Sequence, residues 1–131
     1  MKIETNYVRQ MKEFHKAFEV PISNCPVLID SKGFIRRLSL ITSEVGELGD
    51  AIRQKDIVEI ADALGDLLYV TFGMAVEMGL DIDRIFTEIH LSNMSKANED
   101  GSVSKDEGGK VLKSKRYNPV DLSWVKNETN N

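Results

Sequence analysis

Apolar residues recur at intervals of three and four along most of the chain, and this period predicts amphipathic helices. The first helix covers roughly residues 7–18, with Thr5 or Asn6 as its N-cap, and Pro21 ends it. A second helix covers roughly residues 34–53 after an intervening loop. The apolar seam of this second helix has the spacing three, four, three, four: Leu38, Ile41, Val45, Leu48 and Ile52.

Two further helices are predicted beyond the second. The third covers roughly residues 57–78, and Asp56 is placed to cap its first turn. The fourth begins after a capping aspartate, Asp81 or Asp83, and runs to about residue 97.

The residues between and after these helices carry turn and loop signals. Gly79 has the position of a glycine that closes the third helix, and residues 98–101 form a turn signal. A loop or short hairpin follows, and residues 127–131 are expected to fray. We therefore predict an all-α fold in which four to five helices form a bundle with an irregular basic C-terminal tail. Residues 1–131 are expected to form a single domain.

Acidic residues on the second and third predicted helices form two pairs, Glu44 with Glu47 and Glu59 with Asp62. Each pair has a three-residue spacing, so its two carboxylates lie on the same side of a helix. Asp66 continues the acidic stripe of the third helix. A solvated face usually mixes in Lys and Arg, but none occurs between Lys55 and Arg84. The pattern therefore favours a partly buried functional site over a plain surface.

Carboxylates that are brought together in a partly dry site repel one another, so a cation is expected between them. Oxygen ligands suit a hard cation such as Mg²⁺, with Mn²⁺ as a possible substitute. Such an ion bridges phosphate oxygens and lowers the pKa of a bound water. This predicts metal-assisted chemistry on phosphate, with these candidate metal ligands: Glu44, Glu47, Glu59, Asp62 and Asp66.

Other metal chemistries fit the sequence less well. A dinuclear iron site normally uses a Glu-x-x-His motif, whereas His90 follows Glu88 by two residues. Neither residues 80–84 nor residues 98–101 have the twelve-residue ligand pattern of a calcium loop. Cys25 is the single cysteine, which excludes a cysteine-based zinc cage and an internal disulfide.

Charge is distributed unevenly along the chain, whose formal net charge is -4. Residues 30–94 hold 12 acidic and 6 basic residues, whereas residues 95–126 hold 7 basic and 5 acidic residues. The negative total argues against binding of nucleic-acid polymers or membrane surfaces. The basic tail supplies candidate cations for the phosphates of a nucleotide substrate: Lys96, Lys110, Lys113 and Arg116. An ordinary solvated surface explains the same charges equally well.

The first twenty residues carry charges throughout, so a signal peptide is not expected. The longest weakly charged run, Leu67–Val76, is far too short to span a bilayer. A reducing cytoplasm is the expected location.

The acidic motif resembles the signature of a known superfamily. Glu44-Val-Gly-Glu47, then Glu59-Ile-Ala-Asp62, is similar to the motif of the MazG-like all-α nucleoside triphosphate pyrophosphatases. Three further segments resemble a phosphoribosyl-ATP pyrophosphohydrolase-like subgroup: Phe14-His15-Lys-Ala-Phe18, His90-Leu-Ser-Asn93-Met-Ser-Lys96 and Gly109-Lys110-Val-Leu-Lys113. The resemblance covers residues 8–122. The acid motif is moderately specific by itself and strongly specific together with Ser92-Asn93-Met94-Ser95-Lys96.

The resemblance implies an enzyme that cleaves nucleoside triphosphates between the α and β phosphates, giving a monophosphate and pyrophosphate. Many members of the superfamily remove non-standard or surplus (deoxy)nucleotides in a house-cleaning role. It also implies that the acids of the motif bind Mg²⁺, that Asn93 contacts the base or sugar, and that Lys96 and Lys110 contact phosphate.

Other substrate contacts are possible. Lys113 and Arg116 are further candidates for phosphate. His15 is a candidate base contact, although it lies near the apolar stripe of its helix, where a hydrogen-bonded core histidine is more common. Tyr117 and Trp124 can stack on a base, but anchoring of the tail to the core is the favoured interpretation.

Two departures from the superfamily pattern bear on the mechanism. Many relatives carry a doubled acid where this chain has Ser43 before Glu44. If that acid activates water, Glu44 must take over its role here. In other branches the last acid aligns with Asp66 instead of Asp62. We expect Glu59 and Asp62 to be the primary pair, with Asp66 in the same site.

Three functions remain open at this stage. A Mg²⁺-dependent nucleotide pyrophosphohydrolase leads. Ser43 keeps open a catalytically impaired helical module that binds a nucleotide or a partner. Hydrolysis of phosphoribosyl-ATP ranks lower, because nothing in the sequence identifies recognition of the phosphoribosyl group. The base and sugar of the substrate are not predicted.

The two acid-bearing helices are apolar over more than one face. A chain of four helices has limited means of covering such surfaces, so we expect a homodimer whose subunits complete one another's core.

Overall fold

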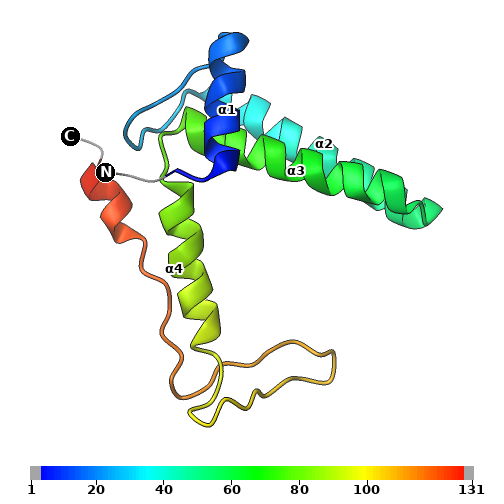
Figure 1. Ribbon diagram of the computed structural model, residues 1–131, viewed down its shortest axis with the longest axis vertical. Helices are drawn as coiled ribbons and strands as arrows, with labels where there is room; N and C mark the ends of the chain where they lie inside the picture. Colours follow the sequence, from blue (N-terminus) through cyan, green and yellow to red (C-terminus); the bar gives the residue numbers. More distant parts are fainter. Residues whose placement is uncertain (1–3, 129–131) are drawn as a thin grey trace. The chain divides into compact units, whose positions relative to one another are not determined.

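The computed structural model describes residues 4–128 and is helical, which confirms the all-α class (Figure 1). Its elements are α1 (Asn6–Ala17), α2 (Ser31–Gln54), α3 (Ile57–Glu77), α4 (Ile82–Met94) and a 3₁₀ helix, η1 (Ser123–Glu128). Among the described residues, extended pairing is confined to an isolated antiparallel bridge between Lys105 and Val111. One compact unit contains α1, α2 and α3, and a second comprises Asp81–Asn127 with α4. The expectation that residues 1–131 form a single domain stays a prediction.

Capping side chains set where the helices begin. Thr5 Oγ1 accepts a hydrogen bond from Val8 N at 3.4 Å at the start of α1. Asp56 and Asp81 cap α3 and α4 in the same way, as the sequence predicted. Helix α2 begins three residues earlier than predicted, because Asp30 Oδ1 accepts a 2.7 Å hydrogen bond from the amide of Gly33 and so caps Ser31–Gln54. Helix α4 ends at Met94 instead of about residue 97.

Gly79 closes α3 with a left-handed backbone, φ +67°, which confirms its predicted place. A Cβ atom at Gly79 would overlap the carbonyl oxygen of Cys25 and lie 2.6 Å from the carbonyl carbon. The loop before α2 is held there by a 2.9 Å hydrogen bond from Val27 N to Met78 O. Only glycine therefore fits both the backbone angle and this close approach.

Gly79→Ala is expected to lower the free energy of unfolding by about 3 kcal/mol, since the added methyl group meets backbone and the φ angle is strained. Gly101 is a matched control because its φ is +83° and no atom lies within 4 Å of a Cβ built there. Gly101→Ala should cost no more than about 1 kcal/mol. Urea denaturation measures both, and equal effects would show that the Cys25 contact does not matter.

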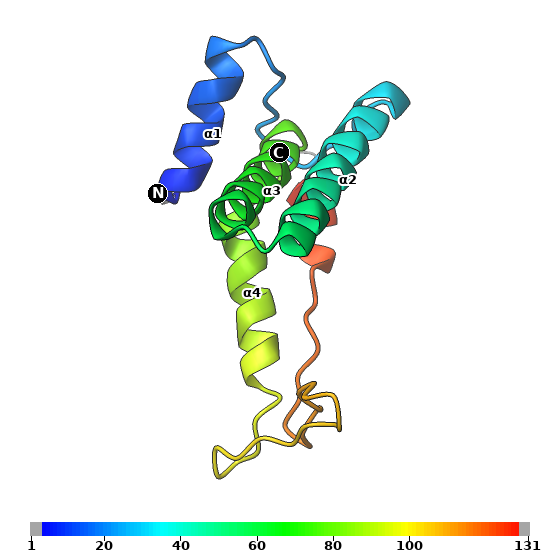
Figure 2. The same cartoon turned by 90° about the vertical axis from the view of Figure 1, so that its right-hand side faces the viewer.

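Within the first unit, α2 and α3 lie side by side and run in opposite directions, and α1 packs on α3 (Figures 1 and 2). The apolar seam that the sequence predicted for α2 is buried only in part. Leu38, Val45 and Ile52 are 63%, 51% and 55% exposed. The buried and half-buried stripe keeps Ile41 and Leu48 of that seam but is rotated by roughly 60°, so that it also includes Arg37, Glu44 and Ala51. One polar side chain of this stripe, Arg37, pairs with Glu77 of α3, and this attraction favours turning this face of α2 inward.

A buried ion pair joins α2 to the C-terminal end of α3. Arg37 Nε donates to Glu77 Oε2, and the two residues are 6% and 4% exposed. Arg36 Nη2 adds a second contact to Glu77 Oε1 at 3.3 Å. The nearby Gly73 leaves room for the guanidinium, because a Cβ there would lie 2.8 Å from Arg37 Nη1. The pair thus fixes the register of the two helices.

The second unit contains α4, an irregular loop and the C-terminal segment. Trp124 Nε1 donates to Glu88 Oε2 at 2.8 Å, and the Arg84 guanidinium lies 3.6 Å from the centroid of the indole ring. Arg84 Nε also bonds to Glu88 Oε1 at 2.9 Å. These contacts anchor the tail to α4, and for Trp124 they match the anchoring role that the sequence favoured over stacking on a base. No helix in residues 4–128 is long and apolar enough to cross a membrane.

Candidate functional site

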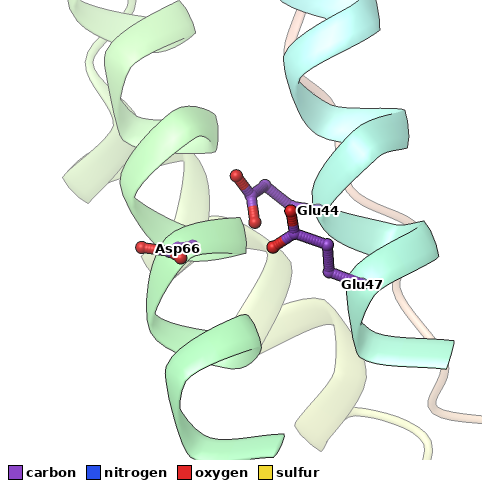
Figure 3. Close-up of side chains that lie close together, drawn as sticks. All are labelled: Glu44, Glu47 and Asp66. Atoms are coloured by element: carbon purple, nitrogen blue, oxygen red, sulfur yellow. The ribbon is translucent and has the colours of Figure 1, made fainter. Parts of the chain in front are cut away.

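Three carboxylates meet between the two long helices of the first unit. Glu44 and Glu47 extend from α2 toward α3, which carries Asp66 (Figure 3). One carboxylate oxygen from each residue lies within 4.8 Å of the other two. The three-residue spacing puts both glutamates on the side of α2 that faces α3. The trio therefore follows directly from helical geometry and from the antiparallel packing of α2 on α3.

The carboxylate of Glu44 experiences the largest electrostatic penalty in this group. Partial burial raises its pKa above the ordinary value, and the negative charges of Glu47 and Asp66 raise it further. A hydrogen bond with Glu47 and the charge of Asp62 act in the same direction. Among the described residues, no donor reaches Glu44 Oε2, although this atom is shielded from solvent. The ionised form thus lacks a positive or hydrogen-bonding partner.

A divalent cation would remove this imbalance. The donor set consists entirely of oxygens, which hard cations prefer, and its spread allows one ion to contact all three residues. The buried oxygen of Glu44 would gain the partner that it lacks. The arrangement can therefore hold a metal ion.

The other two predicted metal ligands are placed differently. Asp62 is close enough for its charge to raise the pKa of Glu44, but it does not belong to the cluster. Glu59 lies in the first turn of α3, where its backbone amide is capped by Asp56 at 3.2 Å. Of the described acids, Asp66 completes the close group with Glu44 and Glu47. The preference for Glu59 and Asp62 as the primary pair stays a prediction.

A cavity of about 260 Å³ opens near the acids in the same unit. Leu40 lines it one helical turn before Glu44, and Tyr69 lines it three residues after Asp66. Its wall is mainly apolar and aromatic, with two guanidinium groups: Met11, Phe14, His15, Val20, Arg36, Arg37, Leu40, Tyr69 and Val70. Neither arginine was among the site residues predicted from the sequence. Their signal in the sequence is a pair of adjacent arginines about two helical turns before Glu44.

His15 is 1% exposed, and its Nδ1 lies 2.9 Å from the carbonyl oxygen of Pro21. Burial lowers its pKa, and the charge of Arg37 adds to this, whereas the Pro21 bond and Glu77 oppose it. These contacts match the core-histidine interpretation of the sequence. A direct base contact by His15 stays a prediction.

The remaining predicted substrate residues belong to the second unit. Asn93 lies in the last turn of α4, and Lys96 follows the cap of that helix. Lys110 belongs to the turn of a short hairpin. The Lys113 ammonium lies 4.8 Å from the centroid of the Tyr117 ring, a cation–π contact. Arg116 is exposed, and its amide bonds to Ser114 Oγ at 3.1 Å.

Comparison with known proteins decides the family. The model of the phosphoribosyl-ATP pyrophosphohydrolase family matches residues 11–93, which is more than half of the chain. The chain belongs to the phosphoribosyl-ATP pyrophosphohydrolase family. This family lies within the MazG-like all-α superfamily, so the resemblance seen in the sequence is confirmed. The family takes its name from a pyrophosphohydrolase activity on phosphoribosyl-ATP.

A viral protein is similar to part of this chain. The uncharacterized protein L479 of Acanthamoeba polyphaga mimivirus is 37% identical over 83 residues, which is 60% of this chain and 33% of that protein. The chain thus spans about a third of the length of this curated relative.

The family match includes the carboxylate cluster and ends at Asn93. The acid-bearing helices α2 and α3 therefore lie within the part of the chain that the family model matches. Lys96, Lys110 and Lys113 lie beyond the matched residues. The family match therefore assigns no role to these lysines.

Proposed function

We propose that this protein is a Mg²⁺-dependent nucleotide pyrophosphohydrolase that cleaves the α–β phosphate bond of (deoxy)nucleoside triphosphates. The products are a nucleoside monophosphate and pyrophosphate. The observation that carries the proposal is the cluster of Glu44, Glu47 and Asp66, with its unpartnered carboxylate oxygen, in a chain of this family. A house-cleaning role on surplus or non-standard nucleotides in the cytoplasm is the setting we propose.

The acids have two tasks in this reaction. Glu44, Glu47 and Asp66, with Asp62 nearby, would hold Mg²⁺, which when bound would supply charge neutralisation at the phosphates and lower the pKa of water. Glu44 or Glu47 accepts a proton from the attacking water, whose oxygen forms a bond to the α-phosphorus. The bridging oxygen between the α and β phosphates leaves with pyrophosphate. If the additional acid that many relatives carry at the position of Ser43 activates water, Glu44 takes over that role here.

The cavity beside the acids is the proposed place for the nucleoside. Aromatic side chains at Phe14 and Tyr69 provide faces on which a base can pack, and Arg36 is 57% exposed at its side chain and able to donate hydrogen bonds. Leu40, which lines this cavity, is one helical turn from Glu44, and this short separation suits the distance between a nucleoside and its α-phosphate. We propose Asn93, Lys96, Lys110, Lys113, Arg116 and Tyr117 as further substrate contacts.

Phosphoribosyl-ATP is a second candidate substrate, and the name of the matching family favours it. It carries the same triphosphate, so the carboxylate cluster suits both substrates equally. The distinction depends on the adenine side, where phosphoribosyl-ATP bears a second ribose phosphate.

A panel assay of pyrophosphate release tests the proposal. Canonical and modified ribo- and deoxyribonucleoside triphosphates are compared with phosphoribosyl-ATP in Mg²⁺ and in Mn²⁺. Release from triphosphates at higher kcat/KM supports the leading proposal, and preference for phosphoribosyl-ATP supports the second. Tight binding of a non-hydrolysable triphosphate by calorimetry, with no release from any substrate, would instead identify a catalytically impaired binding module.

Mg²⁺ affinity is expected to weaken as pH falls through the raised pKa of Glu44, because the ion must displace a proton there. In the metal-free protein the effect on stability has the opposite sign. A raised carboxyl pKa contributes stability at acidic pH that is lost as pH rises through the folded-state value. Calorimetric titration with Mg²⁺ over a pH series measures the affinity. A pH-independent affinity would contradict a role for Glu44 as ligand.

We also propose a homodimer. Leu38, Val45 and Ile52 of the α2 seam are exposed in the single chain, and a Cβ at Gly46 would meet no atom of the described residues within 4 Å. Close packing within this unit therefore does not explain the glycine, whereas an opposing copy of the chain would. Light scattering at micromolar concentration is expected to give twice the monomer mass, and a monomer would contradict the proposal.

A further inference from the structure

Ser95, the C-cap of α4, makes two hydrogen bonds that close a loop of the second unit and a third to the last turn of α4. Its Oγ donates to Ser92 O at 2.6 Å and accepts from Asn118 N at 2.8 Å. Its carbonyl oxygen accepts from Ser114 Oγ at 3.0 Å. Ser92 Oγ donates to Asn118 O at 2.8 Å, so both backbone polar groups of Asn118 are held by serines of α4.

These bonds tie together the two ends of the segment 96–113. Lys96 follows Ser95 directly, and Lys113 precedes Ser114. Both lysines therefore lie within one residue of the closure. Without the closure, their backbone positions would depend on a long connection with little regular structure.

The far part of the same segment is a small hairpin. Asp106 N donates to Lys110 O at 2.9 Å, and Leu112 N donates to Ser104 O at 2.8 Å. Asp106 Oδ1 also accepts from the amide of Lys110 at 2.9 Å. The hairpin gives the segment a defined end, and the Ser95 bonds give it a defined base.

Lysine is a flexible point charge, and ordering it on a phosphate costs side-chain entropy. Backbone ordering adds to that cost when the lysine belongs to a loose loop, and a loop with pinned ends has less freedom to lose on binding. The Ser95 hydroxyl has a further property, because it is donor and acceptor at once. Its removal leaves the Asn118 amide and the Ser92 carbonyl without these partners.

We propose that Ser95 is a positioning residue that holds Lys96 and Lys113 for binding of the substrate's phosphates. It acts through Ser114 and Asn118 and touches no substrate atom. This inference rests on the proposed function, in which the two lysines contact phosphate.

Steady-state kinetics of Ser95→Ala, Ser95→Thr and Ser104→Ala test the proposal with the best triphosphate of the panel. Ser95→Ala is expected to raise KM roughly fivefold to tenfold while kcat changes by less than about twofold. Ser95→Thr keeps a hydroxyl and should restore KM. Ser104 is exposed in the same segment, and its carbonyl group makes the bond described above, so Ser104→Ala should leave KM unchanged. An unchanged KM in Ser95→Ala would overturn the proposal.

Amide hydrogen exchange at Asn118 separates this inference from the proposed function. Exchange should accelerate in Ser95→Ala and return to the wild-type rate in Ser95→Thr. An unchanged rate in Ser95→Ala would overturn the closure itself. If the wild type releases pyrophosphate from no substrate while the Asn118 amide responds as expected, the proposed function and the role in phosphate binding fail but the closure stands.

Discussion

Glu47→Gln is expected to lower kcat/KM for pyrophosphate release by a factor of roughly 10³, with the helical circular dichroism spectrum unchanged. Glutamine preserves shape but removes the negative charge, so a metal ligand and a possible proton acceptor are lost together. Glu47 is exposed, and the folded state should tolerate the change. Thermal stability of the metal-free protein should not fall, because the change relieves repulsion with Glu44.

Asp50→Asn is the matched control on the same helix. Asp50 is exposed and pairs with Arg53, and it does not belong to the carboxylate cluster. Activity of this variant should stay within about twofold of the wild type. Retained activity in both Glu47→Gln and Asp62→Asn would remove the basis of the proposed function. Comparison of Asp62→Asn with Asp66→Asn shows which aspartate of α3 is the more important.

Glu77→Gln is expected to lower the free energy of unfolding by about 3–5 kcal/mol, because Arg37 would stay buried without a full counter-charge. For a chain of this size the melting temperature should fall by roughly 10–20 °C. The loss of stability should affect the whole first unit, since the ion pair joins α2 to α3. Differential scanning calorimetry measures the shift.

The exposed pair between Asp50 and Arg53 again provides the control, and Asp50→Asn should cost no more than about 1 kcal/mol. The double variant Arg37→Met with Glu77→Leu should regain much of the stability lost in Glu77→Gln, because no charge is then left buried without a partner. A melting temperature of Glu77→Gln close to that of Asp50→Asn would show that the pair is not buried in solution.

Local signals were sufficient to predict most helix boundaries. Thr5, Asp56 and Asp81 cap helices through bonds to amides two or three residues ahead, and Gly79 ends α3 through its own backbone. The face that α2 turns inward could be predicted only in part, because apolar periodicity favoured a seam that includes Leu38. The actual inward face is also favoured by the attraction of Arg37 to Glu77, which another helix carries.

The same limit applies to the candidate site. Helical spacing placed Glu44 beside Glu47, since both residues belong to one turn of one helix. Whether Asp62 or Asp66 approaches them depends on the register between α2 and α3. That register is set partly by Arg37 and Glu77, which lie 40 positions apart in the sequence. Their pairing has no local signature, and Glu77 looked like an ordinary helix-end acid.

Hydrolysis in oxygen-18 water tests the central claim most directly. Attack of water on the α-phosphorus predicts one heavy oxygen in the nucleoside monophosphate and none in the pyrophosphate, with Mg²⁺ present. Mass spectrometry of the two products gives the answer in a single experiment. Heavy oxygen in the pyrophosphate, or release of orthophosphate in its place, would contradict the account.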